Sequence, residues 1–147
     1  MTARIANPFH HAGASLKGAM ALEKSFADSG VDQTLLGLVR LRASQINGCA
    51  YCIHEHVRDL QKAGEAEMRI HMLAGWREAT DFSPKERAAL AWTESLTLVA
   101  ATHAPDDVYE DFKAEFSEDE QVIITLVIGA INMWNRLQIG FRVPPAG

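Results

Sequence analysis

The sequence predicts a single all-α domain, and three observations support this prediction. Apolar residues recur at intervals of three and four along most of the chain, as they do on one face of a helix. Two capping boxes, Ser83 with Glu86 and Ser117 with Glu120, mark helix starts. No window alternates at the period of two that a half-buried strand requires. We therefore expect residues 1–147 to form one helical domain of about six to seven helices, without internal repeats or linkers.

Four of these helices are expected in the first half of the chain. The first covers 14–28 and ends at Gly30, and the second covers 32–46, where Asp32 can act as its cap. The third covers 49–64 and the fourth 65–76. The apolar residues that should face inward from the second and fourth helices are Leu35, Leu36, Val39, Ala43 and Ile46, and Met68, Met72, Leu73 and Trp76.

Three further helices are expected in the second half. Ser83 and Pro84 open one that passes through Leu96, Pro105 opens a shorter one, and Ser117 opens the last, which reaches about Ile139 before Gly140 ends it. Residues 122–133 are nearly all apolar, yet this stretch is shorter than the roughly 20 residues that cross a bilayer. It should therefore lie at the centre of the fold or pair with another subunit, and we expect a helical homo-oligomer.

Composition narrows the classes of function. The chain has 48% hydrophobic residues and a net charge of −5, which is typical of a globular protein. Lysines and arginines are scattered, so a nucleic-acid-binding surface is not expected. The first twenty residues contain no long apolar run, so we expect neither a secretory signal nor a membrane anchor, and we expect a cytoplasmic protein.

The stretch "NGCAYCIHEH" contains the chain's two cysteines and two of its six histidines. On a helix, about 100° per residue places Cys49, Cys52 and His56 on one face and turns His54 away. Residues three apart on a helix have Cα atoms about 5 Å apart, which a disulfide tolerates. His56 could take the Cys52 proton, whereas Cys49 would gain from the helix N-terminus and from exposure. The order of attack stays open.

Two other interpretations of this stretch were weighed. A zinc site would need His54 on the same face as the other three groups, and structural zinc sites usually collect ligands from separate segments. Alternatively, both cysteines could simply pack in the interior. A thioredoxin-type site is disfavoured because no strand pattern precedes the cysteines. We therefore expect a redox pair without a metal or other cofactor.

Longer motifs resemble a known family. The stretch "LVRLRASQINGCAYCIHEH", followed by "AGE", "GWRE", "ERAALAW" and "NMWNRL", is similar to the AhpD-like alkylhydroperoxidases of the carboxymuconolactone decarboxylase superfamily. The resemblance covers about residues 35–137. It implies an all-helical fold that assembles as trimers or hexamers.

The resemblance also implies a reaction and a set of site residues. Members of the family reduce hydroperoxides with a thiol pair that cycles between dithiol and disulfide, without haem, flavin or metal. Carried onto this chain, Cys52 would attack the peroxide, Cys49 would close the disulfide, and His56 would relay the proton. A dithiol reductant would restore the pair, and in the best-known members it is a lipoyl-bearing protein.

One position departs from the family pattern. Members usually have a glutamate twelve residues before the first cysteine, and this chain has Gly37 there. Close helix packing would explain a glycine inside a helix, where it costs about 1 kcal/mol relative to alanine. Otherwise the carboxylate has moved or been lost, and peroxidase activity could then be low. Glu23, Glu55 and Glu94 are the possible substitutes.

Two rival functions remain. The superfamily includes decarboxylases that act on a cyclic lactone, although that reaction needs no dithiol. The same cysteine pair could instead act as the switch of a redox sensor or of an interaction protein. Turnover with a dithiol reductant separates an enzyme from a sensor, which would be oxidised without turning over.

Overall fold

The computed structural model describes residues 1–145 and confirms the all-α prediction. Within those residues it contains eight α-helices and two 3-10 turns, so the expected count was slightly low. The helices are α1 (Gly13–Ala27), α2 (Gln33–Asn47), α3 (Ala50–Lys62), α4 (Glu67–Met72), α5 (Pro84–Thr97), α6 (Val99–Thr102), α7 (Asp106–Glu115) and α8 (Glu118–Phe141). The 3-10 turns are η1 (Pro8–His10) and η2 (Leu73–Gly75).

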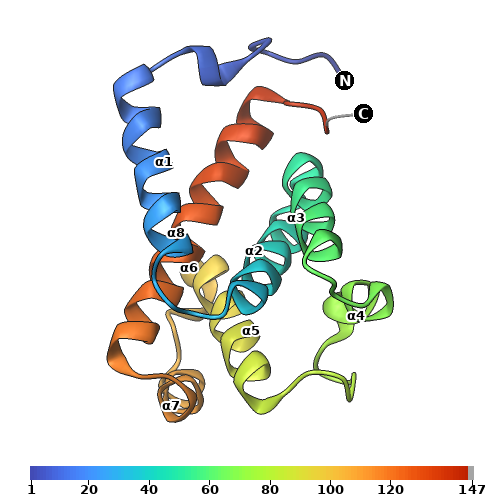
Figure 1. Ribbon diagram of the computed structural model, residues 1–147, viewed down its shortest axis with the longest axis vertical. Helices are drawn as coiled ribbons and strands as arrows, with labels where there is room; N and C mark the ends of the chain where they lie inside the picture. Colours follow the sequence, from blue (N-terminus) through green and yellow to red (C-terminus); the bar gives the residue numbers. More distant parts are fainter. Residues whose placement is uncertain (146–147) are drawn as a thin grey trace.

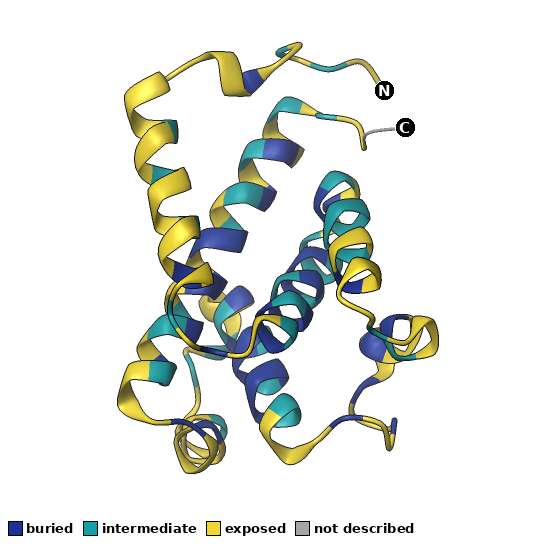
Figure 2. Ribbon diagram, in the orientation of Figure 1, coloured by how far each residue is buried: buried dark blue, intermediate teal, exposed yellow. Residues whose placement is uncertain are grey.

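Helix α2 is the centre of the bundle. It packs against α3, α5 and α8, and in Figure 1 it crosses the middle of the molecule between α3 and α8. The predicted apolar face of α2 is confirmed for Leu35, Leu36, Val39 and Ala43, which are buried, whereas Ile46 at the end of the helix is half-buried. Such a face stabilises the helix chiefly by removing apolar area from water. Figure 2 shows the contrast with α1, whose surface is mostly exposed.

The predicted helix starts are also confirmed. The Asp32 side chain accepts a hydrogen bond from the backbone N–H of Thr34, and both capping boxes are complete. These contacts satisfy amide groups that have no partner inside a helix. Gly48 ends α2 in the left-handed conformation, with φ of 69°, which glycine adopts without a steric penalty.

The fourth predicted helix was too long. Its α-helical part stops at Met72 and continues as the 3-10 turn η2. Leu73 and Trp76 are buried as expected, but Met68 and Met72 are 66% and 38% exposed, so their predicted inward orientation was wrong. The buried residues recur at intervals of three, at Ile70, Leu73 and Trp76, and at about 100° per residue Met68 points away from Ile70.

Two further boundaries differ from expectation. The short helix α6 was not predicted, and α8 continues past Gly140 to Phe141. Arg142 supplies the left-handed cap with φ of 56°, and its N–H donates to the carbonyls of Gln138 and Ile139. The cap hydrogen bonds, rather than the glycine, therefore end this helix.

Helix α8 is both central and exposed. Its inner face is buried against α2 and α5, whereas Val122, Leu126 and Met133 form an outer stripe that is 59%, 48% and 42% exposed. By length and hydropathy alone α8 could cross a membrane, and the core helix of a bundle meets the same criteria. The exposed outer stripe is compatible with the expected homo-oligomer, which stays a prediction.

Candidate functional site

The two cysteines sit at the start of α3. Cys49 is the N-cap of this helix, with extended backbone, and its Sγ accepts a hydrogen bond from the Cys52 N–H at 3.3 Å. The two Cα atoms are 5.3 Å apart and the sulfurs are joined in a disulfide, as the spacing predicted. The expectation that Cys49 would be exposed was wrong, because both residues are buried. They pack against Ala43 and Ile131.

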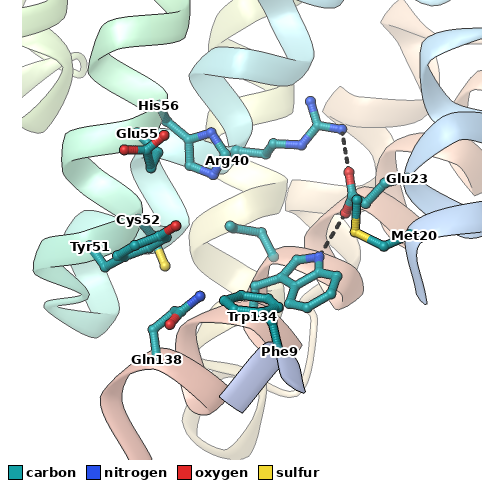
Figure 3. A pocket seen from close by; sticks show the side chains of 11 residues that line it. Phe9, Met20, Glu23, Arg40, Tyr51, Cys52, Glu55, His56, Trp134 and Gln138 are labelled. Atoms are coloured by element: carbon teal, nitrogen blue, oxygen red, sulfur yellow. Dashed lines mark hydrogen bonds and ion pairs between the residues drawn. The ribbon is translucent and has the colours of Figure 1, made fainter. Parts of the chain in front are cut away.

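Cys52 opens onto a cavity of about 290 Å³, which we call the Cys52 cavity. Side chains from η1, α1, α2, α3 and α8 line it, and Figure 3 shows them converging on the space beside the sulfur. The apolar walls are Phe9, Met20, Tyr51, Ile131 and Trp134, and the polar lining residues are Glu23, Arg40, Glu55, His56 and Gln138. A small cavity that combines apolar walls with a group of convergent polar side chains is a typical ligand site.

His56 lies on the Cys52 cavity, in agreement with the predicted shared face of α3. Burial, together with the charge of Arg40, lowers the pKa of its imidazole to about 4, against the opposing carboxylates of Asp59, Glu23 and Glu55. His56 is therefore neutral at neutral pH. The roles of Cys49, Cys52 and His56 in catalysis stay predictions.

Gly37 allows α2 and α3 to pack closely. A Cβ atom at this position would lie 2.8 Å from Cδ2 of Leu60, which is itself buried on α3. This contact supports the packing explanation for the glycine. Gly37 also lines a separate cavity of about 410 Å³, together with Glu23, Arg40 and His56, so the position does approach the predicted relay histidine.

Of the three substitute carboxylates, the structure brings two to the cavity. Glu23 and Glu55 line it, whereas Glu94 bonds Arg42, Arg77 and Trp76 on the other side of α2. Glu23 accepts hydrogen bonds from Arg40 at 3.1 Å and from the Trp134 indole at 2.9 Å, both drawn in Figure 3. These bonds hold the carboxylate of α1 between α2 and α8.

Cys49 opens onto a different cavity of about 390 Å³, which we call the Cys49 cavity. Met1 and the segment 142–145 form part of its wall, together with Gly48 and Ile139. The chain ends meet here because the Arg4 N–H and side chain donate to the carbonyls of Phe141 and Gly140. Sequence analysis missed this cavity, since no motif signals that the two ends of the chain lie together. Tyr51 and Gln138 line both cavities.

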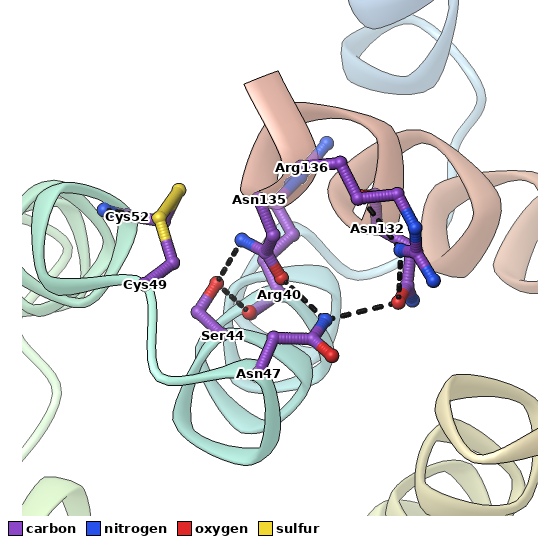
Figure 4. Close-up of a disulfide and its surroundings, with 8 residues drawn as sticks. All are labelled: Arg40, Ser44, Asn47, Cys49, Cys52, Asn132, Asn135 and Arg136. Atoms are coloured by element: carbon purple, nitrogen blue, oxygen red, sulfur yellow. Dashed lines mark hydrogen bonds between the residues drawn. A yellow bond between two sulfur atoms is a disulfide. The ribbon is translucent and has the colours of Figure 1, made fainter. Parts of the chain in front are cut away.

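A polar network fixes the turn that carries the cysteines (Figure 4). The Asn47 amide donates to Asn132 at 2.9 Å and to Asn135 at 2.8 Å, and Asn135 donates to Ser44 at 3.0 Å. Asn135 is fully buried, so these bonds offset its loss of hydration. The "NMWNRL" motif thus supplies hydrogen bonds to this turn through Asn132 and the buried Asn135.

The remaining histidines and the zinc interpretation can be placed as well. His54 bonds Glu55 at 3.1 Å and lines neither cavity, as its predicted direction required. His10, His11, His71 and His103 are exposed. Within residues 1–145 no group of three or more potential ligands is arranged to hold a metal ion.

This fold and cysteine site define the carboxymuconolactone decarboxylase family, and the chain belongs to it. The family model matches residues 14–95. The chain is 40% identical over 124 residues to the uncharacterized protein YdfG of Bacillus subtilis, covering 84% of each chain. Its backbone matches that of ATU0492 from Agrobacterium tumefaciens, with a TM-score of 0.95 and 41% identity over 99% of each chain. ATU0492 is described as a protein of unknown function and as a candidate AhpD antioxidant defence protein.

A more distant structure shares the fold. A peroxidase-related protein from Ralstonia eutropha, described as an alkylhydroperoxidase AhpD core, has a TM-score of 0.81 at 18% identity, covering 94% of this chain and 74% of that one. The AhpD-like fold predicted from the sequence motifs is therefore confirmed.

Proposed function

We propose that this protein is a thiol-dependent peroxidase that reduces organic hydroperoxides through the Cys49–Cys52 pair. One observation carries the proposal: Cys52 of a bonded cysteine pair and a neutral His56 share an apolar cavity. Thiol peroxidases need a nucleophile beside a base, and a second thiol that resolves the oxidised sulfur.

The chemistry starts from the dithiol form. His56 takes the proton of the Cys52 thiol, and the thiolate attacks the terminal oxygen of R–O–O–H. The O–O bond breaks, the sulfur becomes a sulfenic acid, and the alkoxide takes the proton from His56 to leave as an alcohol. The Cys49 thiol then attacks the Cys52 sulfur, and water leaves as the disulfide forms. In sum, two thiols and one hydroperoxide give a disulfide, an alcohol and water.

A dithiol reductant would restore the pair at Cys49. The Cys49 cavity supports this assignment, because Cys49 lines it and Cys52 does not. A thiolate from the reductant would attack Cys49, release the Cys52 thiolate, and then close its own disulfide. The partner proposed from family resemblance is a lipoyl-bearing protein.

Assembly and location belong to the same proposal. The exposed stripe of Val122, Leu126 and Met133 on α8 supports a homo-oligomer, a trimer or a hexamer, because a contiguous apolar surface is costly to leave in water. A cytoplasmic location fits the cycle, since cytoplasmic thiol systems keep dithiols reduced.

Peroxide consumption with a dihydrolipoyl donor tests the function. The wild-type protein should turn over cumene hydroperoxide many times per chain, whereas Cys52→Ser should not turn over. A wild-type chain that forms its disulfide once and stops would instead favour the redox-sensor function. A chain that neither oxidises nor turns over would contradict the proposal.

A further inference from the structure

The carboxamide of Gln138 is a buried polar group that the fold leaves without a partner. Gln138 is 4% exposed, and its Oε1 has no hydrogen-bond partner within residues 1–145. Buried carboxamides in folded proteins are normally bonded, because losing hydration without compensation is unfavourable. An orphaned amide in a native interior therefore needs an explanation.

Another buried glutamine on the same helix shows what a structural carboxamide looks like. Gln121 is 8% exposed, its nitrogen donates to the Phe116 carbonyl at 2.7 Å, and its oxygen accepts from the Tyr109 hydroxyl at 3.0 Å. Both ends of that amide hold neighbouring elements together. The Gln138 oxygen accepts no hydrogen bond from the described residues 1–145, so holding α8 in place does not account for it.

The position of Gln138 points to a ligand. It lines both the Cys52 cavity and the Cys49 cavity. In Figure 3 its side chain lies between Tyr51 and Trp134, below Cys52, with its nitrogen directed toward the space among them. The amide is thus presented to whatever occupies the space beside the reactive sulfur.

The chemistry of the cavity indicates which ligand fits. A carboxamide offers two donors and one acceptor, and the –O–O–H group of a hydroperoxide offers one donor and several acceptor lone pairs. The walls beside Gln138 are aromatic, with Tyr51 and Trp134 on either side, and the charged residues Glu23, Arg40 and Glu55 line the other end of the cavity with His56. It therefore suits a compact apolar body that carries one small polar head.

We propose that Gln138 binds the –O–O–H head of a bulky organic hydroperoxide and orients its terminal oxygen toward the Cys52 sulfur. This inference rests on the proposed function, which it extends from the reaction to the recognition of the substrate. A small, fully polar peroxide such as hydrogen peroxide gains nothing from the aromatic walls and should be a poor substrate.

Replacement by methionine separates recognition from structure. Gln138→Met keeps the length of the side chain and removes the orphaned amide. Its thermal midpoint should rise by about 2–4 °C, since an unsatisfied buried group is lost. Its kcat/KM for cumene hydroperoxide should fall about tenfold or more, because the hydrogen bond to the –O–O–H head is lost while the apolar walls that hold the organic body are unchanged.

Gln121→Met is the matched control. It removes a bonded amide of the same helix, so its thermal midpoint should fall and its kcat/KM should stay at the wild-type value. If Gln138→Met were instead less stable and as active as the wild type, the amide would be structural and the inference would be overturned.

Binding of the alcohol product to the oxidised protein tests the role of Gln138 without relying on catalytic turnover. Cumyl alcohol, the product of cumene hydroperoxide reduction, should bind the oxidised wild-type protein, and Gln138→Met should bind it about tenfold more weakly, which calorimetry or NMR titration would detect. Equal binding by both chains would overturn the role of Gln138. If binding of cumyl alcohol depended on Gln138 but the wild-type protein showed no peroxide turnover, the ligand-binding role of Gln138 would stand. The proposed peroxidase activity would then be refuted.

Discussion

The two sides of the Cys49–Cys52 disulfide differ in what surrounds them. On the Cys52 side, α1, α2, α3 and α8 supply aromatic walls and a cluster of titratable groups. On the Cys49 side, the two ends of the chain supply a wall that includes one exposed arginine, Arg142. The difference arises because Cys49 is the N-cap of α3 and Cys52 belongs to the first turn of this helix. Cys49 therefore lines the Cys49 cavity and Cys52 lines the Cys52 cavity, although the two sulfurs are bonded to each other.

The difference suggests how one cysteine pair reacts with two molecules, a hydroperoxide at Cys52 and a dithiol reductant at Cys49. A cavity walled by helix side chains, many of them aromatic or aliphatic, suits a small apolar molecule and places His56 on its lining. A cavity bounded by terminal segments suits a dithiol carried on another protein. The following predictions test whether the two sides are independent.

Removal of either sulfur should have the largest effect. In Cys49→Ser, Cys52 keeps its base and its cavity, so one equivalent of peroxide should still be consumed rapidly before turnover stops. Cys52→Ser should lose the rapid phase itself, by about a thousandfold or more, since the nucleophile is gone. Stopped-flow peroxide consumption measures both variants. If the rapid phase were retained in Cys52→Ser and lost in Cys49→Ser, Cys49 rather than Cys52 would be the thiol that attacks the peroxide.

His56→Gln should slow the rapid phase about a hundredfold, because a positioned base typically contributes a factor of this order or more. The rate of disulfide reduction at Cys49 should change much less. Stopped-flow rates measured separately for peroxide and for reductant provide the comparison. An equal loss in both steps would show that His56 supports the fold rather than one side.

Acid unfolding tests the environment of His56 independently. Its pKa is about 4 in the folded protein and near 6.5 when unfolded, so the unfolded state binds more protons between those values. Stability should therefore fall by about 2–3 kcal/mol as pH drops from about 6.5 to 4. Urea titrations should show that His56→Gln lacks this part of the loss.

Glu23→Gln should lower the rapid-phase rate about tenfold, a factor equivalent to one pKa unit of His56. Without the carboxylate, only Asp59 and Glu55 oppose the Arg40 charge beside His56, and the imidazole becomes a weaker base. The double variant Gly37→Glu with Leu60→Ala returns a carboxylate near His56 and makes room for it, so it should restore the rate when added to Glu23→Gln. A Glu23→Gln chain with wild-type rates would exclude Glu23 as the substitute carboxylate.

Arg142→Glu should have the smallest effect, confined to the Cys49 side. Reversing this charge should slow re-reduction by dihydrolipoate, which carries a carboxylate, about threefold at low salt. Re-reduction by neutral dithiothreitol and the peroxide step should not change. If both reductants slow equally, the arginine affects the structure of the cavity and not the approach of the reductant.

Sequence reasoning succeeded where the relevant interactions are local. Capping boxes, the Asp32 cap and the glycine after α2 were readable because the interacting groups lie within three residues. The disulfide and the common face of Cys52 and His56 also followed from helical spacing. Met68 and Met72 were misassigned because apolar residues occur on more than one side of this short helix, and only its packing shows that the side with Ile70 and Leu73 faces the core.

The sequence by itself determined that the chain is helical, where most helices begin, and that two thiols and a histidine occupy one end of α3, since these depend on hydrogen bonds and geometry within a few residues. The tertiary structure alone decided that Glu23 and Gln138 reach that end from α1 and α8, and that the two sulfurs face separate cavities. Those arrangements depend on helix packing between residues more than eighty positions apart, as in the Asn47–Asn135 hydrogen bond. No spacing along the chain encodes such a contact.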